Sequence, residues 1–528
     1  MTHPARPEDR DPVVVVGGGP VGLTAALLLA KQNVPSIVLE RRSERSEAPR
    51  AHVINPRSLE IYRMLDLDVS EMIAQAAAPE DDTASHFRWR TTGKRFGGVP
   101  FEQHDDTHTP HPRINLAQPR LERILLDEVG RSPLIDLRVG HRVSDLVAEK
   151  NTSVATVSTD DGQTYELSSD YTLACDGANS EVRQRLGIGL HGQPDVQPCL
   201  TIHFEGDLRD LVGDEPGMFY WSVGAKLPGI LIAYDIDKTW VYLSFMAPEI
   251  VPSAAEAKDI VFDALGTDDV DITVRHVIPW VMTAQVADTF RAGRVFLVGD
   301  AAHRFPPSGG LGLNTGIQDA HNLAWKIAAV RNGVAGPELL DTYDTERRGV
   351  AEINTHQSLA NAGSALRVFQ LGEDAPQQDW DAAINGMRDG LNSLALQIGF
   401  TYAETSAPHT GVQGYVPRAE PGDRMPHAWY GNGGQPRSTL DLLDPHGFTL
   451  LTGPAGAWTD VNFGDRPVSV VPVRDDDAIP AWWVELTGIA GTGALLVRPD
   501  GHIAARVSAD GVAEQESITH ALQDLLRR

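Results

Sequence analysis

Residues 13–40 constrain the fold more than any other part of the chain. Four valines predict a buried strand, a tight turn follows, and a second apolar strand ends at Glu40, about 20 residues beyond the turn. The turn has the pattern G-x-G-x-x-G and contains Gly17, Gly19, Pro20 and Gly22. Gly17 permits the turn, Gly19 allows the backbone to approach a pyrophosphate, and Gly22 lets helix and strand pack closely. With Pro20 suited to a first helical turn and free N–H groups at the helix start, the segment predicts dinucleotide binding.

Length and composition indicate a folded protein of two or three domains, because 528 residues exceed one ordinary core. The net charge of −27 argues against nucleic acid or an anionic membrane as a partner. Residues 1–12 are polar, and no apolar run is long enough to span a bilayer. The cysteines, Cys175 and Cys199, form no C-x-x-C or metal-type pair, so we expect no bound metal and a cytoplasmic protein.

Two further motifs follow apolar strands. Residues 175–183 read CDGANSEVR, where Asp176 begins a tight turn and Ser180 can cap a short helix. Residues 293–314 read GRVFLVGDAAHRFPPSGGLGLN, with Asp300 at the carboxyl end of a buried strand, the edge where α/β proteins bind ligands. The glycines that follow leave backbone N–H groups uncovered at a helix start. This arrangement suits a planar ring that gains negative charge on reduction, such as a flavin.

Together, the three motifs resemble those of the single-component FAD-dependent aromatic hydroxylases, and the resemblance covers roughly residues 12–370. It implies an α/β fold in which a Rossmann-like FAD-binding domain carries an inserted antiparallel β-sheet substrate domain. Residues 421–427 and 495–506 look like the thioredoxin-like C-terminal domain of phenol hydroxylase-type members. That domain lacks C-x-x-C here, which excludes dithiol chemistry, so its expected role is packing or contact within a homodimer.

These patterns predict the domain boundaries. We expect the FAD-binding domain at residues 1–86, 115–190 and 290–371, and the substrate sheet at 87–114 and 191–289. Residues 372–417 are expected to form a partly helical linker, and 418–528 the thioredoxin-like domain. Aromatic and β-branched runs within 198–246 predict antiparallel strands. Apolar periodicity predicts helices at 57–64, 119–129, 316–330 and 516–526.

The resemblance implies roles for individual residues in holding FAD non-covalently. Glu40 is expected to bind the adenosine ribose, Gly19 the pyrophosphate and Asp300 the ribityl chain. Arg50 matches an arginine near the pyrophosphate and the nicotinamide cofactor, and Gln118 a side chain along the flavin. Without the other motifs, Arg50 reads as a surface cation and Gln118 as a helix cap. The expected FAD contacts are Gly17, Gly19, Pro20, Gly22, Glu40, Arg41, Arg50, Gln118, Asp176, Asp300, Pro307, Gly310, Gly312, Leu313 and Asn314.

His52 falls where phenol hydroxylase-type members place an active-site residue, often aspartate, that can take the phenol proton. A histidine titrating near neutrality can do this work while contacting the substrate, and a phenolate is the better carbon nucleophile. The plain alternative is a histidine hydrogen-bonded within its loop. Pro307, expected beside the flavin ring, is the second predicted catalytic residue. Tyr220, Trp221 and Tyr234 are predicted to contact the substrate, although such aromatic residues are often core.

The resemblance implies hydroxylation of a phenolic or related aromatic substrate with NAD(P)H and O₂, through a flavin C4a-hydroperoxide. No second G-x-G-x-x-G marks a separate nicotinamide domain, which agrees with NADPH or NADH acting as a transient reductant. One alternative is a polyketide-tailoring oxygenase of the epoxidation or Baeyer–Villiger type on the same fold. Another is a non-catalytic flavin-binding regulator. A flavin-dependent halogenase is disfavoured because the W-x-W-x-I-P motif is absent.

Overall fold

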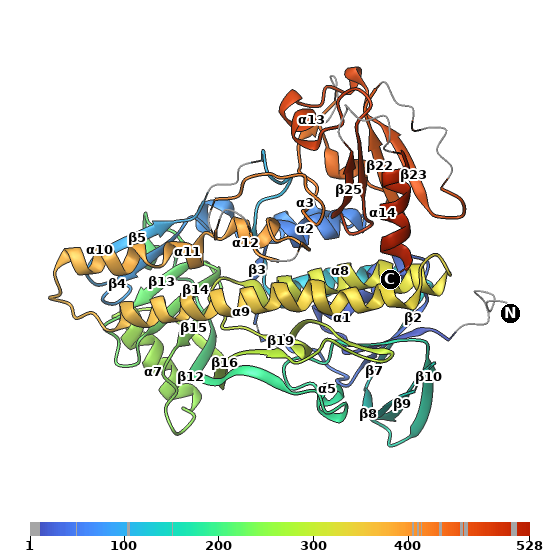
Figure 1. Ribbon diagram of the computed structural model, residues 1–528. Coiled ribbons are helices and arrows are strands. Elements are labelled where there is room, and N and C mark those ends of the chain that lie inside the picture. Colours follow the sequence, from blue (N-terminus) through green and yellow to red (C-terminus); the bar gives the residue numbers. More distant parts are fainter. Residues whose placement is uncertain are drawn as a thin grey trace.

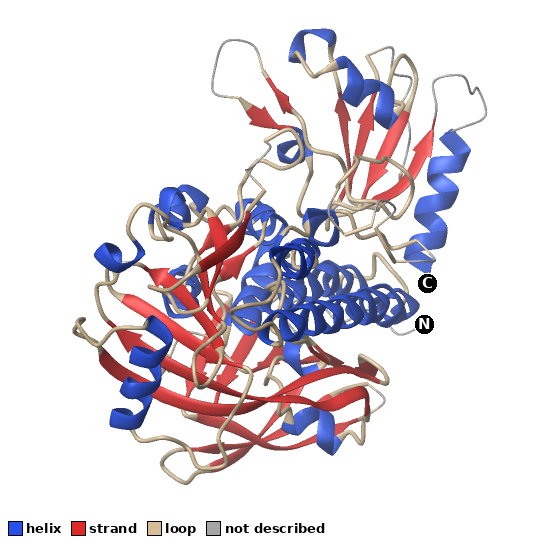
Figure 2. Ribbon diagram, turned by 90° about the vertical axis from the view of Figure 1, so that its left-hand side faces the viewer, coloured by secondary structure: helices blue, strands red, loops and turns tan. Residues whose placement is uncertain are grey.

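The computed structural model describes residues 11–48, 50–102, 106–149, 151–403, 406–408, 411–412, 414–431, 436–454, 458, 463–507 and 515–527. Figure 1 shows a large sheet at one end, antiparallel except for the parallel pair of strands at residues 84–88 and 219–222, a helix-covered parallel sheet at the other, and a C-terminal unit resting on the helices. In Figure 2 these helices are seen end-on at the middle of the molecule. Within the described part of the chain, no helix is both long and apolar enough to cross a membrane.

The parallel sheet has six strands in the order β17-β18-β11-β1-β2-β7. Its strands are β1 (Val13–Val16), β2 (Ser36–Glu40), β7 (Ile135–Val139), β11 (Thr172–Ala174), β17 (Arg291–Ala292) and β18 (Val295–Leu297). All neighbouring pairs are parallel except β17 with β18. The valines of β1 are all buried, as expected for the centre of a parallel sheet covered on both faces.

Helices and a small sheet cover these strands. Three helices pack together beside them, namely α1 (Pro20–Lys31), α4 (Gln118–Arg131) and α8 (Leu311–Arg331). Against β2 packs a three-stranded sheet made of β8 (His141–Ala148), β9 (Ser153–Thr159) and β10 (Thr164–Ser169). Shorter elements are β3 (Val53–Ile54), β6 (Ile114–Asn115), α2 (Pro56–Met64), α3 (Val69–Ala74), α5 (Glu181–Arg185) and α6 (Arg209–Val212).

The second large sheet has the order β19-β16-β12-β15-β14-β13-β4-β5. Its strands are β4 (Ala84–Arg88), β5 (Arg95–Pro100), β12 (Leu190–Glu205), β13 (Phe219–Ser222), β14 (Gly229–Asp235), β15 (Thr239–Ser244), β16 (Thr273–Ala287) and β19 (His303–Arg304). One face, which includes Ile202 and Tyr220, packs on α7 (Ala254–Leu265). The other, which we call the inner face, includes Cys199, Trp221 and Tyr234.

Helices from the later part of the chain cover the inner face. They are α9 (Thr342–Phe369), α10 (Gln377–Asn385), α11 (Arg388–Leu391) and α12 (Leu394–Ile398). α9 packs against α8. Three residues near its C-terminal end also join the core that covers the inner face, namely Ala362, Ala365 and Val368. At about 1.5 Å per residue its 28 residues extend about 42 Å, which is enough to join the two sheets.

The C-terminal unit is a four-stranded sheet in the order β23-β22-β24-β25 with helices α13 (Ala481–Thr487) and α14 (Gln515–Arg527). Its strands are β22 (Phe448–Thr452), β23 (Val468–Pro472), β24 (Ala494–Val497) and β25 (Ile503–Val507), preceded by the short pair β20 (Trp429–Tyr430) and β21 (Arg437–Ser438). β22 and β23 are parallel and the other pairs antiparallel, which is the thioredoxin-like arrangement.

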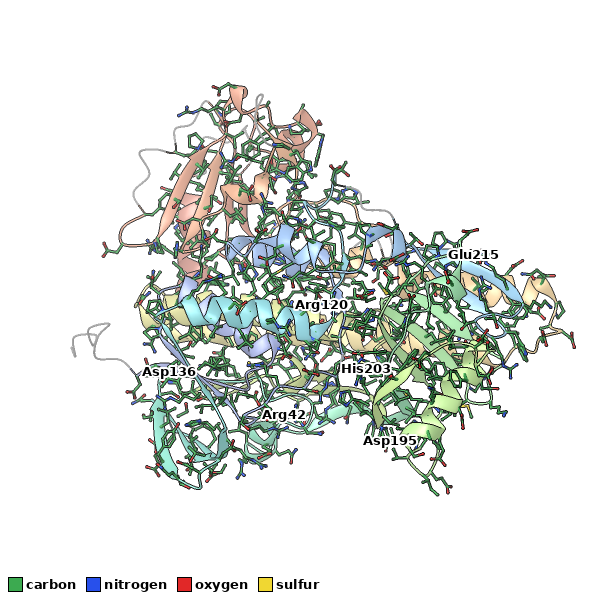
Figure 3. All side chains as sticks on the ribbon, turned by 180° about the vertical axis from the view of Figure 1, so that it is seen from behind. Arg42, Arg120, Asp136, Asp195, His203 and Glu215 are labelled. Atoms are coloured by element: carbon green, nitrogen blue, oxygen red, sulfur yellow. The ribbon has the colours of Figure 1, made fainter. Side chains whose placement is uncertain are left out.

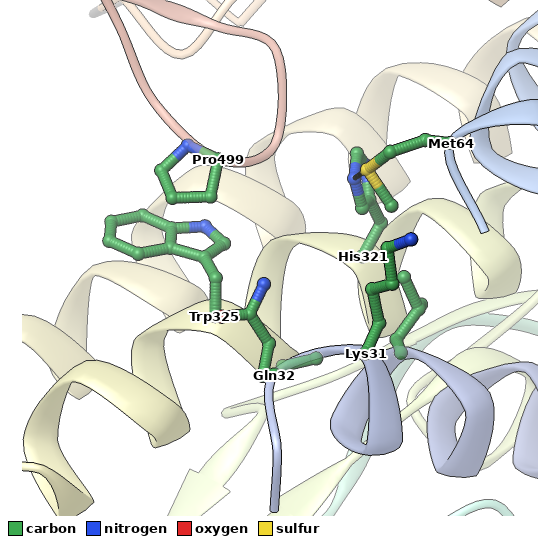
Figure 4. Close-up of a pocket in the computed structure, with 8 residues that line it drawn as sticks. Lys31, Gln32, Met64, His321, Trp325 and Pro499 are labelled. Carbon is green, nitrogen blue, oxygen red and sulfur yellow. Dashed lines mark hydrogen bonds between the residues drawn. The ribbon is translucent and has the colours of Figure 1, made fainter. Parts of the chain in front are cut away.

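This unit docks closely on α1, α2 and α8. Figure 4 shows Pro499 against Trp325, with His321 and Met64 nearby. The cavity between them has a volume of only about 10 Å³, room for a single water molecule. Buried ion pairs cross the junction, including Arg424 with Glu60 at 2.5 Å. The C-terminal unit is therefore joined to the rest of the chain by a packed, charged interface.

The elements agree with the sequence pattern except at boundaries. The helix expected at 316–330 begins earlier, at Leu311, because Gly310 takes a left-handed conformation (φ 62°) and starts it. The sheet unit expected from residue 87 starts at Ala84, because β4 already pairs with β5 and β13 there. With the start of the sheet unit moved to residue 84, we propose the domain boundaries given above.

Candidate active site

The three sequence motifs meet at one edge of the parallel sheet. β11 lies between β1 and β18, and all three strands run in the same direction. The loops that follow them are joined by backbone hydrogen bonds, from Cys175 N–H to Val16 O (2.8 Å) and from Val298 N–H to Ala174 O (3.0 Å). The glycine turn, Asp176 and Asp300 therefore lie at neighbouring carboxyl ends, where an extended ligand can contact them in sequence.

In the glycine turn, Gly17 and Gly22 pack closely against other protein atoms, whereas Gly19 faces open space. Gly17 has φ 106°, and a Cβ on Gly22 would lie 1.9 Å from the Gly17 carbonyl oxygen. A Cβ on Gly19, by contrast, would meet nothing within 4 Å. Gly19 is the N-cap of α1, with Pro20 next to it and no side-chain cap. The free N–H groups of α1 therefore face open space, as a pyrophosphate requires.

Charged side chains surround this turn. Glu40 accepts hydrogen bonds from Gly18 N–H (2.8 Å) and Arg42 N–H (2.9 Å), which fixes its carboxylate beside the turn. Arg41 is exposed and paired with Glu181 at 3.4 Å, so the structure gives it no contact with the turn. Arg45, which the motifs did not identify, donates to Gly18 O (2.8 Å). Its only signal in the sequence is the basic run that follows β2.

Asp176 has an acceptor atom without a partner. Its Oδ2 accepts from Val182 N–H (3.1 Å), but its Oδ1 is buried and makes no hydrogen bond with the described residues. Burial raises the pKa of this carboxyl. Arg183 fixes the loop by donating to Ala301 O (2.9 Å), and Arg304 donates to Ala178 O in return. These two hydrogen bonds hold the loops of the second and third motifs together. Asp176 Oδ1 can still accept a hydrogen bond from a hydroxyl or amide group.

Asp300 is exposed, although the protein around it removes enough water to raise the pKa of its carboxyl. Among the opposing charges that act on it is Arg50, so the structure brings these two predicted residues near each other. A Cβ on Gly312 would lie 4.0 Å from Asp300 Oδ1, so Gly312 also faces this carboxylate. A carboxylate in this position can accept hydrogen bonds from a polyol chain.

A buried cluster of charged side chains contacts the backbone next to Asp300. Asp319 accepts from Gly299 N–H (3.1 Å), contacts His303 Nε2 at 2.7 Å and accepts from Arg347 Nε (2.7 Å). The side chains of Asp319, His303 and Arg347 are all fully buried. Sequence reasoning missed Asp319 because it lies in a helix 19 residues from Asp300 with no local motif of its own.

The loop before α8 presents uncovered backbone. Pro307 is exposed, Gly309 and Gly310 have positive φ, and Gly310 starts α8 without a side-chain cap. Leu313 is half-buried against the core. Asn314 differs from the expectation. Its amide donates to Val53 O and Gly310 O and accepts from Asn55 N–H and Ser58 Oγ, so its side chain holds α2 and β3 in place.

His52 sits just before β3 and is held by Asn115. His52 Nδ1 lies 2.9 Å from Asn115 Oδ1, while Asn115 Nδ2 donates to Ala233 O (2.7 Å). That second bond orients the amide, so Oδ1 accepts and Nδ1 carries the imidazole proton. His52 Nε2 is then a bare acceptor. His52 is partly exposed, but burial lowers its pKa to about 4 despite the opposing effect of Asn115, so His52 does not titrate near neutrality.

The aromatic residues divide between the two faces of the sheet. The Tyr234 ring lies 4.6 Å from His52, and its hydroxyl donates to Arg50 O (3.2 Å). Phe219, which sequence reasoning missed, lies 6.0 Å from His52. Trp221 shares their face but stacks on Phe87 within the core. Tyr220 points to the opposite face, toward α7, so the structure separates it from His52.

Gln118 connects the loop that carries His52 with the side chains beside the glycine turn. Its Oε1 accepts from Ala51 N–H (3.3 Å), and its Nε2 donates to Glu122 (2.7 Å), which pairs with Arg45 at 3.1 Å. The side chain is therefore partly used within the protein. It remains beside the loop that carries Arg50 and His52.

The residues present fit FAD. The uncapped α1 and α8, the open space at Gly19 and the unpartnered Asp176 oxygen are matched to phosphates, a ring that gains charge and a polar chain between them. The fit rests on features at three places, namely the start of α1 at Gly19, Asp176 and the start of α8.

Comparisons with known proteins agree. The chain matches the FAD binding domain family over residues 10–358 and the aromatic-ring hydroxylase C-terminal family over residues 418–528. It is 31% identical to 4-methyl-5-nitrocatechol 5-monooxygenase of Burkholderia sp, covering 100% of both chains. It is also 31% identical to tetracenomycin A2 monooxygenase-dioxygenase of Streptomyces glaucescens, covering 98% of this chain and 97% of that one.

Solved structures give the same answer. The fold is similar to that of the flavin-dependent monooxygenase PieE in complex with FAD and substrate, with TM-score 0.88, 29% identity and coverage of 99% and 100% of the two chains. It is similar to aklavinone-11 hydroxylase with FAD and aklavinone, with TM-score 0.82, 28% identity and coverage of 98% and 100%. The chain belongs to the FAD-dependent aromatic-ring hydroxylases, and it is a monooxygenase of that family.

Proposed function

We propose that the enzyme hydroxylates an aromatic compound bearing a phenolic hydroxyl, which donates a hydrogen bond to His52 Nε2. The observation that carries this proposal is the fixed tautomer of His52. Asn115 occupies the protonated Nδ1, and Nε2 makes no hydrogen bond with the described residues. Tyr234 and Phe219 flank the imidazole and suit an aromatic ring.

FAD would be held by the residues at the sheet edge. Glu40 would bind the adenosine ribose, the start of α1 and Arg45 the pyrophosphate, and Asp176 and Asp300 the chain that leads to the ring. The loop from Pro307 to Leu313 would lie along the ring. Arg50, exposed and near Asp300, would face NADPH or NADH as it donates its hydride. When bound and reduced, FAD supplies the chemistry that transfers one oxygen atom from O₂ to the aromatic ring.

The low basicity of His52 decides how it acts. Its pKa of about 4 lies well below that of an ordinary phenol, so complete proton transfer from the phenol to His52 before the reaction is unfavourable. His52 therefore works as a neutral acceptor that orients the hydroxyl and withdraws its proton partially, which enriches the ring carbons in electron density. Once the ring has been attacked, the hydroxyl is much more acidic and passes its proton to His52 Nε2, which releases it to water.

A phenol panel tests this function. The holoenzyme should consume NAD(P)H and O₂ faster in the presence of phenols, and each phenol that binds should yield a product with one additional hydroxyl. Methyl ethers of the same phenols are the matched control, because they cannot donate to His52. A protein that takes up no FAD, or that oxidises NAD(P)H equally with phenol and ether, would contradict the proposal.

A variant pair tests His52 itself. His52→Leu should lower kcat/KM for the phenol by about 10- to 100-fold, since the hydroxyl loses its acceptor. His52→Gln should recover part of the loss through its amide oxygen. FAD content should stay unchanged in both. Between pH 6 and 8 the enzyme should show no inflection from His52, because its pKa lies about 2 units below that range. An inflection that disappears in His52→Gln would show that His52 is a base.

The relatives favour a second substrate class. One is named as a tetracenomycin A2 monooxygenase-dioxygenase, and one solved neighbour holds aklavinone. A polycyclic, polyketide-type aromatic is therefore the second candidate substrate. A cytoplasmic location, a possible homodimer, and the lack of nucleic acid or membrane partners stay predictions from the sequence.

A further inference from the structure

A row of cross-strand neighbours crosses the inner face of the large sheet. His203 on β12 pairs with Val241 on β15, which pairs with Ile232 on β14, which in turn pairs with Phe219 on β13. Since Ile202 points toward α7, His203 points to the inner face. One end of the row thus carries Phe219, whose ring lies 6.0 Å from His52, and the other end carries a second histidine.

His203 is a buried polar side chain without a hydrogen-bond partner. It is 7% exposed, and neither ring nitrogen is hydrogen-bonded to any described residue. Among the residues that the structure describes, its ring stacks only on the exposed His276, with centroids 5.4 Å apart. In Figure 3 His203 is labelled near the middle of the molecule. An unsatisfied buried imidazole costs free energy, which a ligand on this face would recover.

The protonation state limits what such a ligand can be. Burial, with a further contribution from His276, lowers the pKa of His203 to about 4, so the ring is neutral at pH 7. A neutral imidazole offers one donor and one acceptor. Glu47 and Glu205 act on His203 with negative charge, although Arg275 pairs with Glu205 at 2.5 Å. The ring therefore suits an uncharged hydroxyl or carbonyl better than a carboxylate.

We propose that His203 is a specificity-determining residue that binds a second oxygen group, at the far end of a fused-ring aromatic substrate. This rests on the proposed function, in which the reacting hydroxyl lies at His52. His52 contacts residues of β13 and β14, and β12 lies two strands beyond β14, about 10 Å away at the usual strand spacing. At this strand spacing a single benzene ring beside His52 does not reach β12, whereas a substrate of two or more fused rings extends toward it.

Binding of two probes to the holoenzyme tests the proposal without turnover. A naphthol and dihydroxynaphthalenes with the second hydroxyl on the other ring are titrated, and the change in flavin absorbance gives Kd. The unmodified enzyme should bind the best dihydroxy probe about 10-fold more tightly than the naphthol. His203→Leu should remove that advantage and leave the Kd of the naphthol unchanged. His203→Gln, which keeps a donor and an acceptor, should retain part of it, and equal FAD content and unfolding midpoints verify the fold.

Three results would overturn the role of His203. They are equal Kd values for both probes in the unmodified enzyme, an equal loss for both in His203→Leu, and no binding of either probe. Failure of the proposed function gives a different result, namely no phenol-dependent consumption of NAD(P)H and O₂. Hydroxylation of simple phenols by an enzyme that binds neither naphthalene probe would therefore refute the far-end contact alone.

Discussion

Replacing Gly22 with alanine should weaken FAD binding by more than about 100-fold. The added Cβ would lie 1.9 Å from the Gly17 carbonyl oxygen, which is backbone and cannot rotate away. The turn after β1 must then open, which moves the first N–H groups of α1 away from the phosphates. Overpacking costs about 1–3 kcal/mol, and this clash, with a backbone atom, is expected at the upper end of that range. FAD retained after gel filtration and Kd from flavin fluorescence measure the effect.

Gly130→Ala is the matched control for Gly22→Ala. Gly130 is exposed on α4, and a Cβ there would meet nothing within 4 Å. That alanine should leave FAD affinity unchanged and stabilise the helix by up to about 1 kcal/mol. A Gly22→Ala protein that keeps one FAD per chain at the affinity of the unmodified enzyme would show that the turn does not hold the phosphates.

Replacing Arg498 with methionine should destabilise the protein by about 3–5 kcal/mol. Arg498 binds Glu346 of α9 at 2.8 Å and Asp500 at 2.5 Å, and its side chain is 5% exposed. Without Arg498, the only ion pair left to these two largely buried carboxylates among the described residues is that of Glu346 with Lys326, at 2.7 Å. Denaturant unfolding followed by tryptophan fluorescence measures the loss. A change below about 1 kcal/mol would contradict the account.

Arg131→Met controls for loss of an arginine, because Arg131 is 73% exposed and pairs with Glu128 at the surface. This substitution should lower the free energy of unfolding by less than about 1 kcal/mol.

The pH dependence of the stability gives a second check on the role of Arg498. Arg498 and Lys326 lower the pKa of Glu346 to about 2, from 4.5, against the opposing effect of burial. The contribution of this carboxylate to the free energy of unfolding is thus fully present above about pH 5 and is lost as the pH falls toward 2. In Arg498→Met, stability should depend less on pH over this range.

Much of the proposed FAD site at the edge of the parallel sheet could be predicted from local sequence. Gly17 and Gly22 are recognisable because a tight turn and a close backbone approach both require glycine. Asp300 is recognisable because it directly follows an apolar strand. Arg45, Asp319 and Phe219 are not, since their roles depend on contacts with distant segments. Asn314 shows the reverse case. It was predicted to contact FAD, but its side chain makes four hydrogen bonds within the protein, to Val53, Asn55, Ser58 and Gly310.

The substrate side was harder to predict, because faces and environments are properties of the folded sheet. Tyr220 and Trp221 are adjacent in sequence, and only the pairing of β13 shows that they point to opposite faces. The pKa of His52 depends on burial by residues from β6, β13 and β14, which no local pattern reveals. Its tautomer depends on Asn115, 63 residues away.

Product analysis after turnover under ¹⁸O-labelled O₂ tests the central claim most directly. The enzyme with FAD, NAD(P)H and a phenol from the panel should give a hydroxylated product in which the new oxygen, and only that one, carries the label. In His52→Leu the amount of labelled product should fall while FAD stays bound. A product whose new oxygen comes from water, or NAD(P)H oxidation that gives no hydroxylated product with any phenol, would contradict the account.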